Sequence, residues 1–230
     1  CITAYDASIS KYLEASEIDI VLVGDSLGQV IKGEKTTHNV TIDEVSYHAS
    51  CVKSGLKNSI LMTDLPKNSY DTKSKAFKNS LKLLSLDLAD LIKIEVSNNN
   101  LDIVRYLIKK DVPLCAHIGL LPQSINSKSG YRKYGKTKKE AEELFDLAVH
   151  LDANGVKIIL LECVENSLAK RISESCRVPV IGIGSGLKLD GQVAVIYDLL
   201  GISFNKIDSF TFDSTNSLDK QIKMFTNKLK

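Results

Sequence analysis

The strongest constraint on the fold is a repeated alternation of short apolar runs with longer amphipathic stretches. Several runs are apolar throughout, such as Ile20-Val-Leu-Val23 and Ile158-Ile-Leu-Leu161. Continuous apolar strands are typical of parallel sheets that are covered on both faces. The strand candidates occupy residues 2–5, 19–24, 59–63, 91–96, 113–118, 156–161, 179–183 and 193–197.

The stretches between these runs carry helical periodicity, with apolar residues three and four positions apart. Ile42, Val45 and Ala49 fall on one helical face in this way, and Thr41 with Glu44 forms a capping-box pattern before them. Up to eight such strand–helix units fit into 230 residues. The chain is therefore predicted to be an α/β protein of the (β/α)8 TIM-barrel class, which typically needs about 250 residues.

We expect a single barrel domain over residues 1–230, with residues 205–230 forming a C-terminal loop and a closing helix. The alternative fold is an open, doubly wound sheet. No Gly-x-Gly-x-x-Gly follows the first strand candidate, which argues against the dinucleotide-binding form of that sheet. The chain begins at Cys1, next to a strand candidate, so we expect further residues upstream.

Charge and composition argue against several classes of partner. The formal net charge of +2 gives no reason to expect nucleic acid binding. No apolar run approaches the roughly 18–20 residues of a membrane span, so no membrane is expected as a partner. The five cysteines include no Cys-x-x-Cys pair, which predicts reduced thiols and a cytoplasmic location.

Polar and ionisable residues cluster where the predicted strands end. In a barrel, the carboxyl ends of all strands converge on one mouth, the face that carries the active site. We therefore predict the functional site at this mouth. The residues concerned are Asp25, Ser26, Asp64, Lys93, Glu95, His117, Glu162 and the glycine-rich segment 182–186.

Most of these residues also have a structural interpretation. Asp25 and Ser26 are typical of a turn that caps a helix. Lys93 and Glu95 share one side of a strand and form a structural ion pair in the simplest reading. A histidine inside an apolar strand is commonly a hydrogen-bonded core residue. Glu162 follows four apolar residues, so burial would raise its pKa and suit it for proton transfer.

Three carboxylates near one mouth, without the Cys or His spacing of a zinc site, predict a hard divalent cation, with Mg²⁺ as the default. A metal beside a lysine suits a 2-oxo acid, because the metal polarises the keto group and lowers the cost of an enolate. A carboxylate on another strand can take the α-carbon proton. The residues alone thus indicate metal-assisted enolisation, and segment 182–186 leaves a phosphorylated substrate open.

Short motifs in a fixed order cover the chain from Thr3 to about Gly201. They include Thr3-Ala-Tyr-Asp6, Val23-Gly-Asp-Ser-Leu-Gly28, Asp64-Leu-Pro66, Lys93-Ile-Glu95, His117-Ile-Gly-Leu120, Pro122-Gln-Ser124, Leu161-Glu-Cys-Val164, Ile181-Gly-Ile-Gly184 and Asp190-Gly-Gln192. In these motifs the chain resembles the ketopantoate hydroxymethyltransferase family. Any one motif alone would be weak, but their order makes chance similarity implausible.

The resemblance implies transfer of a hydroxymethyl group from 5,10-methylenetetrahydrofolate to 3-methyl-2-oxobutanoate, giving 2-dehydropantoate in pantothenate biosynthesis. It also implies Mg²⁺ as cofactor and a homo-oligomer, typically a decamer. By motif match, the implied base is Glu162. The implied metal residues are Asp25, Asp64 and Glu95. The implied substrate-binding residues are Asp25, Ser26, Asp64, Lys93 and His117.

The chain departs from the family pattern at several positions. Lys67 stands where a Phe is usual, Val96-Ser97 replace two glycines, and Ser185 replaces an Ala. Two other functions therefore stay open. One is a different Mg²⁺-dependent oxo-acid enzyme of the phosphoenolpyruvate mutase and isocitrate lyase type, although its lysine–cysteine–glycine lid motif does not occur here. The other is a catalytically degenerate barrel that acts as a binder or scaffold.

Overall fold

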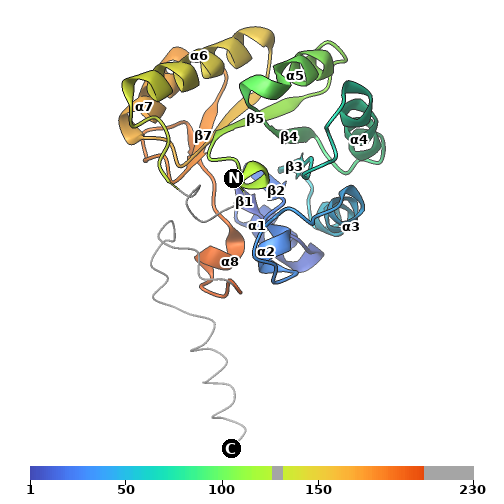
Figure 1. Ribbon diagram of the computed structural model, residues 1–230. Coiled ribbons are helices and arrows are strands. Elements are labelled where there is room, and N and C mark those ends of the chain that lie inside the picture. The colour runs from blue at the N-terminus through green and yellow to red at the C-terminus, as the bar shows by residue number, and fades with distance from the viewer. Residues whose placement is uncertain (126–131, 205–230) are drawn as a thin grey trace, which may run out of the picture.

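A computed structural model describes residues 1–125 and 132–204, and it contains a sheet of eight parallel strands (Figure 1). The strands stand in the sheet in chain order, so each pairs with the next one along the sequence. They are β1 (Ile2–Thr3), β2 (Ile20–Val23), β3 (Ile60–Asp64), β4 (Leu91–Glu95), β5 (Leu114–Gly119), β6 (Ile158–Glu162), β7 (Val180–Ile183) and β8 (Gly191–Gln192).

The sheet curls until its first and last strands meet. Ile2 forms a parallel bridge with Ala194, just after β8. The Thr3 N–H donates to the Ala194 carbonyl at 3.0 Å, and the Ala194 N–H donates to the Cys1 carbonyl at 3.1 Å. This closure confirms the predicted barrel class, and the open doubly wound sheet is wrong.

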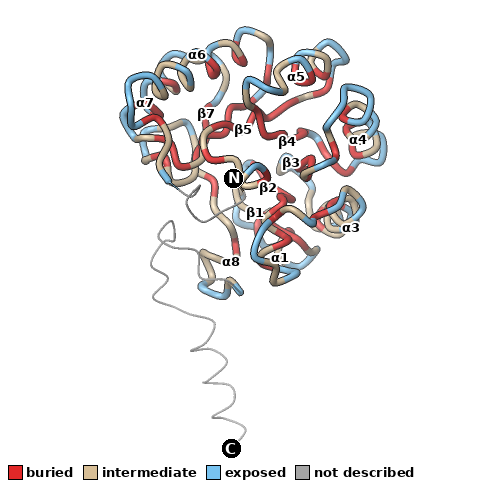
Figure 2. Tube along the Cα trace, viewed as in Figure 1, coloured by how far each residue is buried: buried red, intermediate tan, exposed pale blue. Residues whose placement is uncertain are grey.

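Helices surround the sheet and cover its outer face (Figure 1). The buried side of each long helix faces the sheet, and its exposed side faces solvent (Figure 2). The long helices are α1 (Ala7–Ala15), α3 (Ile42–Lys53), α4 (Lys73–Ser85), α5 (Leu101–Ile108), α6 (Lys138–Asn154) and α7 (Asn166–Ser175). The short ones are α2 (Leu27–Val30), α8 (Ile196–Leu199) and the 3₁₀ turns η1 (Asn98–Asn100) and η2 (Pro122–Ser124).

Side-chain caps start four of the long helices. The side chains of Asp6, Thr41, Thr72 and Thr137 accept backbone N–H groups from the first turns of α1, α3, α4 and α6. At α3, Glu44 also reaches back to the Thr41 N–H, so the predicted capping box is present. Each cap satisfies N–H groups that a helix start otherwise leaves without a partner.

The core has two layers, one on each face of the sheet. The larger layer lies between the strands and the helices. The second fills the inside of the barrel, and its members come from alternating positions of the strands: Ile20, Leu22, Met62, Leu91, Cys115, Ile158, Leu160, Ile181 and Val193. The barrel is therefore a packed interior and not a pore, and its apolar part ends where the polar residues of the mouth begin.

The last predicted strand is wrong in position. We expected residues 193–197 to be extended, but β8 is Gly191–Gln192 and α8 begins at Ile196. The Ile196 N–H donates to the side-chain hydroxyl of Thr3, on β1, and not to a backbone carbonyl of that strand. The apolar run extended the predicted strand too far, because α8 begins at Ile196 and buries this residue in the outer core. The predicted closing segment 205–230 lies outside the described residues.

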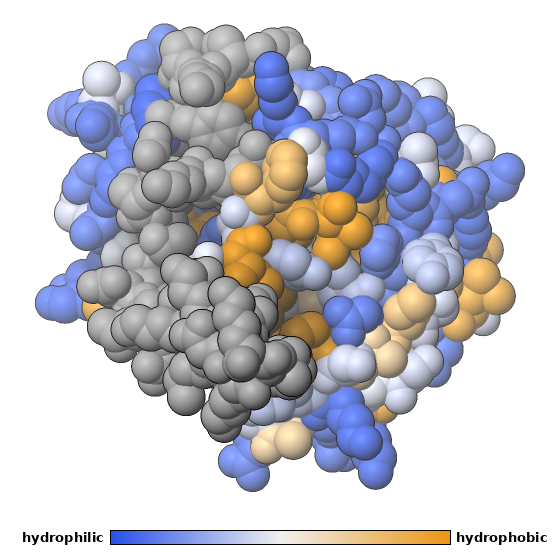
Figure 3. Space-filling view, turned by 90° about the horizontal axis from the view of Figure 1, so that it is seen from below, coloured by the Kyte–Doolittle hydropathy of each residue, from blue (hydrophilic) through white to orange (hydrophobic). Residues whose placement is uncertain are grey.

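No helix within the described ranges has both the length and the hydrophobicity needed to cross a membrane. All five cysteines are free, as predicted. On the face seen in Figure 3, hydrophobic residues gather near the centre, and hydrophilic residues border them toward the right.

Candidate active site at the barrel mouth

The mouth of the barrel collects five buried ionisable side chains. Alternate residues of a strand face the same way, so the positions that follow the apolar interior residues of β3, β4 and β5 also point inward. These buried groups are Asp25, Asp64, Lys93, Glu95 and His117, none more than 6% exposed. Because water is largely excluded, their charges act on one another at a low effective dielectric constant.

Asp64, the last residue of β3, connects two neighbouring strand ends. Its Oδ2 accepts a hydrogen bond from Lys93 Nζ at 2.7 Å and one from the Asp25 N–H at 3.2 Å. Burial raises the pKa of Asp64 to about 7, although the Lys93 ammonium opposes this. Asp64 Oδ1 and Asp25 Oδ2 are buried without a hydrogen-bond partner among the described residues. Carboxylate oxygens left in this way suit a hard cation such as Mg²⁺.

Glu95, the third predicted metal residue, is held by a different partner. Its Oε1 accepts the Gln123 N–H at 2.9 Å, and its Oε2 lies 3.5 Å from the Ser124 hydroxyl. Burial, followed by the nearby Asp25, raises its pKa. Over residues 1–125 and 132–204, no three His, Cys, Asp or Glu side chains are already grouped as a metal site. The structure thus joins Asp25 to Asp64, whereas Glu95 faces η2.

His117 and Glu162 form a second pair at the mouth. His117 Nε2 lies 3.1 Å from Glu162 Oε2. Burial lowers the pKa of His117 well below its usual value, so the imidazole is neutral. Burial also raises the pKa of Glu162 to about 8, and its side chain stays 21% exposed. A carboxylate of high proton affinity with an open side is suited to taking a proton from a ligand.

The two pairs belong to one electrostatic site. The charges of Asp25 and Lys93 shift the pKa values of Asp64, Glu95, His117 and Glu162 alike. Burial opposes the charge on Lys93, but Asp64, Asp25 and Glu95 outweigh it and raise the lysine pKa above its ordinary range. The mouth therefore keeps one permanent cation among carboxylates, which is an arrangement that can receive an anionic ligand and a metal together.

Ser26 lies beside this cluster and does not act as a helix cap. It precedes α2, but its side chain makes no capping hydrogen bond, so the capping interpretation is wrong for this residue. Its hydroxyl oxygen instead lies 2.7 Å from the Tyr5 hydroxyl. Tyr5 occurs in the first matched motif, yet nothing in the sequence pattern pointed to its hydroxyl.

Gln123 is a second residue that the sequence analysis left without a role. Its side-chain amide donates to the Leu65 carbonyl at 3.1 Å and accepts from the Tyr70 hydroxyl at 2.8 Å. Its backbone N–H holds Glu95. Gln123 thus ties the segment after β5 to the loop after β3 across the mouth. The Pro122-Gln-Ser124 motif was the available signal.

The departures from the family pattern do not place side chains among these groups. Val96 is 1% exposed, and its N–H donates to the His117 carbonyl at 2.8 Å. Ser97 caps η1 through the Asn99 N–H. Lys67 Nζ lies 3.3 Å from His38 Nδ1.

Ser185 lies in the glycine-rich segment but turns away from the mouth. Its hydroxyl donates to the Leu161 carbonyl at 2.9 Å and accepts the Val164 N–H at 3.0 Å. These two bonds bracket Glu162 and Cys163, and Cys163 has a left-handed φ of 52°. The hydroxyl is therefore engaged by the backbone and offers nothing to a phosphorylated substrate.

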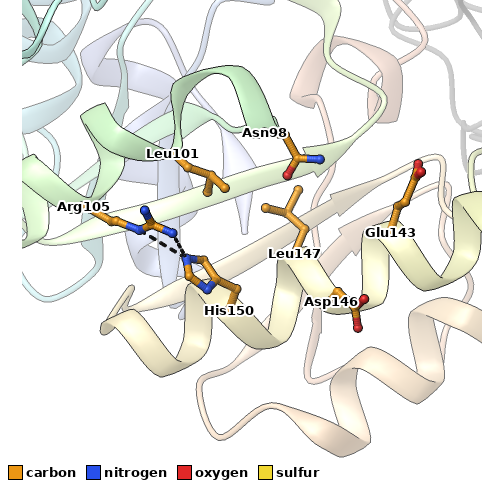
Figure 4. Close-up of a pocket in the computed structure, with 7 residues that line it drawn as sticks. All are labelled: Asn98, Leu101, Arg105, Glu143, Asp146, Leu147 and His150. Carbon is orange, nitrogen blue, oxygen red and sulfur yellow. Dashed lines mark hydrogen bonds between the residues drawn. The ribbon is translucent and has the colours of Figure 1, made fainter.

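A separate hollow of about 340 Å³ lies on the outer layer between α5 and α6 (Figure 4). Arg105 Nη2 lies 2.8 Å from His150 Nε2 there. The other lining residues are Asn98, Leu101, Glu143, Asp146 and Leu147. None of them belongs to the ionisable cluster at the mouth, so this hollow is not part of the candidate site.

Solved structures of similar shape support the fold. The structure of oxaloacetate acetylhydrolase with the product oxalate has a TM-score of 0.64 at 13% identity, covering 100% of this chain and 92% of that one. Phosphonopyruvate hydrolase with oxalate and Mg²⁺ has a TM-score of 0.63 at 9% identity, covering 99% and 90%. At such low identity, these similarities establish the barrel fold alone.

Similarity in sequence identifies the family, which similarity in fold does not. A protein named 3-methyl-2-oxobutanoate hydroxymethyltransferase 1 from Aliivibrio fischeri is 46% identical over 210 residues, which cover 91% of this chain and 79% of that protein. A second Aliivibrio fischeri protein, named 3-methyl-2-oxobutanoate hydroxymethyltransferase 2, is 40% identical over 232 residues, which cover 100% of this chain and 88% of that protein. The family model for ketopantoate hydroxymethyltransferase matches residues 1–229. The chain belongs to the ketopantoate hydroxymethyltransferase family.

Proposed function

We propose that the protein transfers a hydroxymethyl group from 5,10-methylenetetrahydrofolate to 3-methyl-2-oxobutanoate, with Mg²⁺ as cofactor. The observation that carries the proposal is the electrostatic site at the mouth, where a buried lysine and unpaired carboxylate oxygens lie near a carboxyl group of raised pKa. Enolisation of a 2-oxo acid needs all three: a cation, metal ligands and a base. Membership of the family supplies the donor and the acceptor.

Binding of the oxo acid is assigned to groups that are otherwise without a full set of partners. Asp25 and Asp64 would hold Mg²⁺ through their unpaired oxygens, with Glu95 nearby. The bound metal would polarise the keto group and favour the enolate. Lys93 and Ser26 would bind the carboxylate side of the acid, because an ammonium and a hydroxyl both donate to carboxylate oxygens.

Proton abstraction is assigned to Glu162. Its carboxylate takes the C3 proton of the oxo acid, and the electron pair of the C–H bond becomes the enolate. The enolate carbon then forms the new C–C bond to the one-carbon unit of the donor. Both C–N bonds of that unit break to release tetrahydrofolate, and one water supplies the oxygen of the new hydroxyl group, its protons and the C3 proton being shared between that hydroxyl and the two freed nitrogens. His117, being neutral and 3.1 Å away, lines the pocket beside the carboxyl group without adding charge.

Other parts of the proposal follow from family membership and not from the site. We propose a homo-oligomer, a decamer by resemblance, and a cytoplasmic location. A lyase or mutase acting on another oxo acid is the second candidate, since barrels of that type share the fold. Nothing at the mouth favours it over the transferase, and the sequence similarity to the hydroxymethyltransferases is far higher.

The test is proton NMR of 3-methyl-2-oxobutanoate in D₂O with the protein, with and without Mg²⁺. We expect Mg²⁺-dependent loss of the C3 proton signal, and formation of 2-dehydropantoate once the folate donor is added. Asp64→Asn is the matched variant, and it should need far more Mg²⁺ for the same exchange rate. No exchange at saturating Mg²⁺ and oxo acid would reject the proposed function.

A further inference from the structure

A row of hydroxyl groups runs from the last unit of the barrel to the mouth. The Ile196 N–H, at the start of α8, donates to Thr3 Oγ1 at 3.0 Å. The Tyr5 phenol oxygen lies 2.7 Å from Ser26 Oγ, and the nearby Thr3 hydroxyl lowers the pKa of the phenol against the effect of burial. Thr3 and Tyr5 are 1% and 2% exposed, so water does not compete for these bonds.

The bond between Tyr5 and Ser26 has a favoured direction because the phenol is buried and has a single proton. Ser26 Oγ is the acceptor at hydrogen-bond distance from that phenol, so a phenol that accepted from Ser26 instead would leave its own proton buried without a partner. The Ser26 proton then has no acceptor among the described residues.

The structure holds Tyr5 firmly in this place. His48 Nδ1 lies 2.7 Å from the Tyr5 carbonyl, to which a ring N–H can only donate. The Tyr5 ring packs against the rings of His48 and Tyr197, at centroid distances of 6.2 and 5.9 Å. Burial raises the pKa of Tyr5, so the phenol keeps its proton.

We propose that Tyr5 is a positioning residue that turns the Ser26 hydroxyl into a donor toward the carboxylate of the oxo acid. Without a hydrogen bond from the phenol, the Ser26 hydroxyl could rotate and donate in several directions. Only some of these directions point its proton at the carboxylate of the oxo acid. The inference rests on the proposed function, in which Ser26 binds that carboxylate. It adds Tyr5 to the residues that prepare the site, although its phenol need not touch the ligand.

The test is a double-mutant cycle with Tyr5→Phe and Ser26→Ala, read by the oxo-acid concentration for half-maximal C3 exchange. We expect Tyr5→Phe to raise this concentration about three- to tenfold, the size of one hydrogen bond, with little change in the exchange rate at saturation. In the Ser26→Ala background, the same substitution should change it less than about twofold. An equal effect in both backgrounds would show that Tyr5 acts by packing and would overturn the proposal.

A stability cycle separates this inference from the proposed function. Urea unfolding of the same Tyr5 and Ser26 variants measures their hydrogen bond without any ligand, and we expect positive coupling between them. If the two variants are coupled in stability but the parent protein does not catalyse C3 exchange of the oxo acid, the proposed function is rejected and the hydrogen bond between Tyr5 and Ser26 is retained. Absence of coupling would reject that hydrogen bond whatever the protein binds.

Discussion

The inside of the barrel has two halves that lie on the same strands and are about equally buried, yet differ completely in chemistry. On β6, Ile158 and Leu160 pack in the apolar half, and Glu162, two residues further on, lies at the mouth. On β4, the same step leads from Leu91 to Lys93. Burial of the apolar half stabilises the folded protein. Burial of the charged groups at the mouth destabilises it unless those charges are paired.

This difference indicates where stability and function are located. Apolar side chains inside the barrel need only fill space, so their removal should lower the free energy of unfolding and leave chemistry intact. The ionisable groups at the mouth are costly to bury, and their pKa values are displaced for the same reason. Groups of displaced pKa that gather in one place are typical of a catalytic site.

The largest effect is expected for Glu162→Gln. Glutamine keeps the shape and the contact with His117 but cannot take a proton, so C3 exchange should fall by about 10²–10⁴-fold. Binding of 3-methyl-2-oxobutanoate, measured by ligand-observed NMR, should change little. The control is Glu174→Gln, at an exposed glutamate that pairs with Lys170 on α7. If Glu162→Gln exchanged at the parent rate, the base would be another residue.

The converse effect is expected for Leu160→Ala in the apolar half. Leu160 is 1% exposed, so its truncation leaves a cavity and should lower the free energy of unfolding by about 2–5 kcal/mol. The exchange rate of the folded protein should stay within about threefold of the parent, because no mouth group loses a partner. Urea unfolding and NMR exchange measure the two quantities. Leu187→Ala, at a side chain 79% exposed, is the control and should change neither.

A loss of exchange in Leu160→Ala comparable to that of Glu162→Gln would contradict the separation. It would mean that the apolar half holds the mouth groups in place closely enough to act as part of the site.

The two halves should also differ in how they affect the pH dependence of the free energy of unfolding. The pKa of Glu162 is about 8 in the folded protein, against an ordinary value of 4.5, so the folded state binds the extra proton between these limits. Stability from this group is therefore present at low pH and is lost as the pH rises toward 8. Between about pH 5 and pH 8, the parent should lose about 1–3 kcal/mol more than Glu162→Gln, an amount reduced by the partial exposure of the carboxyl group.

Urea unfolding at several pH values measures this difference. Leu160→Ala should be less stable throughout but should follow the parent's pH dependence, because it leaves Glu162 in place. Parallel curves for the parent and Glu162→Gln would show that burial does not displace this pKa.

The sequence predicted the barrel and the gathering of polar residues because both depend on local regularities. Apolar runs at regular intervals identify parallel strands, and their carboxyl ends meet at one mouth. The side-by-side placement of Lys93 and Glu95 follows from strand alternation alone. The structure adds that Lys93 pairs with Asp64, on the neighbouring strand, and that Glu95 turns to η2.

What the sequence could not predict depends on contacts between loops that are distant along the chain. Gln123 joins Leu65, 58 positions away, and Tyr5 joins Ser26 across the first helix. Neither pair has a periodicity or a spacing that would reveal it. The last strand was misplaced for a similar reason, since the polar pair Gly191–Gln192 is extended only because β7 pairs with it.

The smallest effect is expected for Ser185→Ala, at the boundary between the two halves. The serine hydroxyl joins the Leu161 carbonyl to the Val164 N–H, on either side of Glu162, and its removal leaves both buried groups without that partner. We expect the free energy of unfolding to fall by about 1 kcal/mol. The exchange rate should fall about two- to fivefold, because the base loses part of its support. Ser167→Ala, at an exposed position of α7, is the control. A loss of stability with an unchanged exchange rate would assign Ser185 to the scaffold, since the position of Glu162 would then depend on the strand alone.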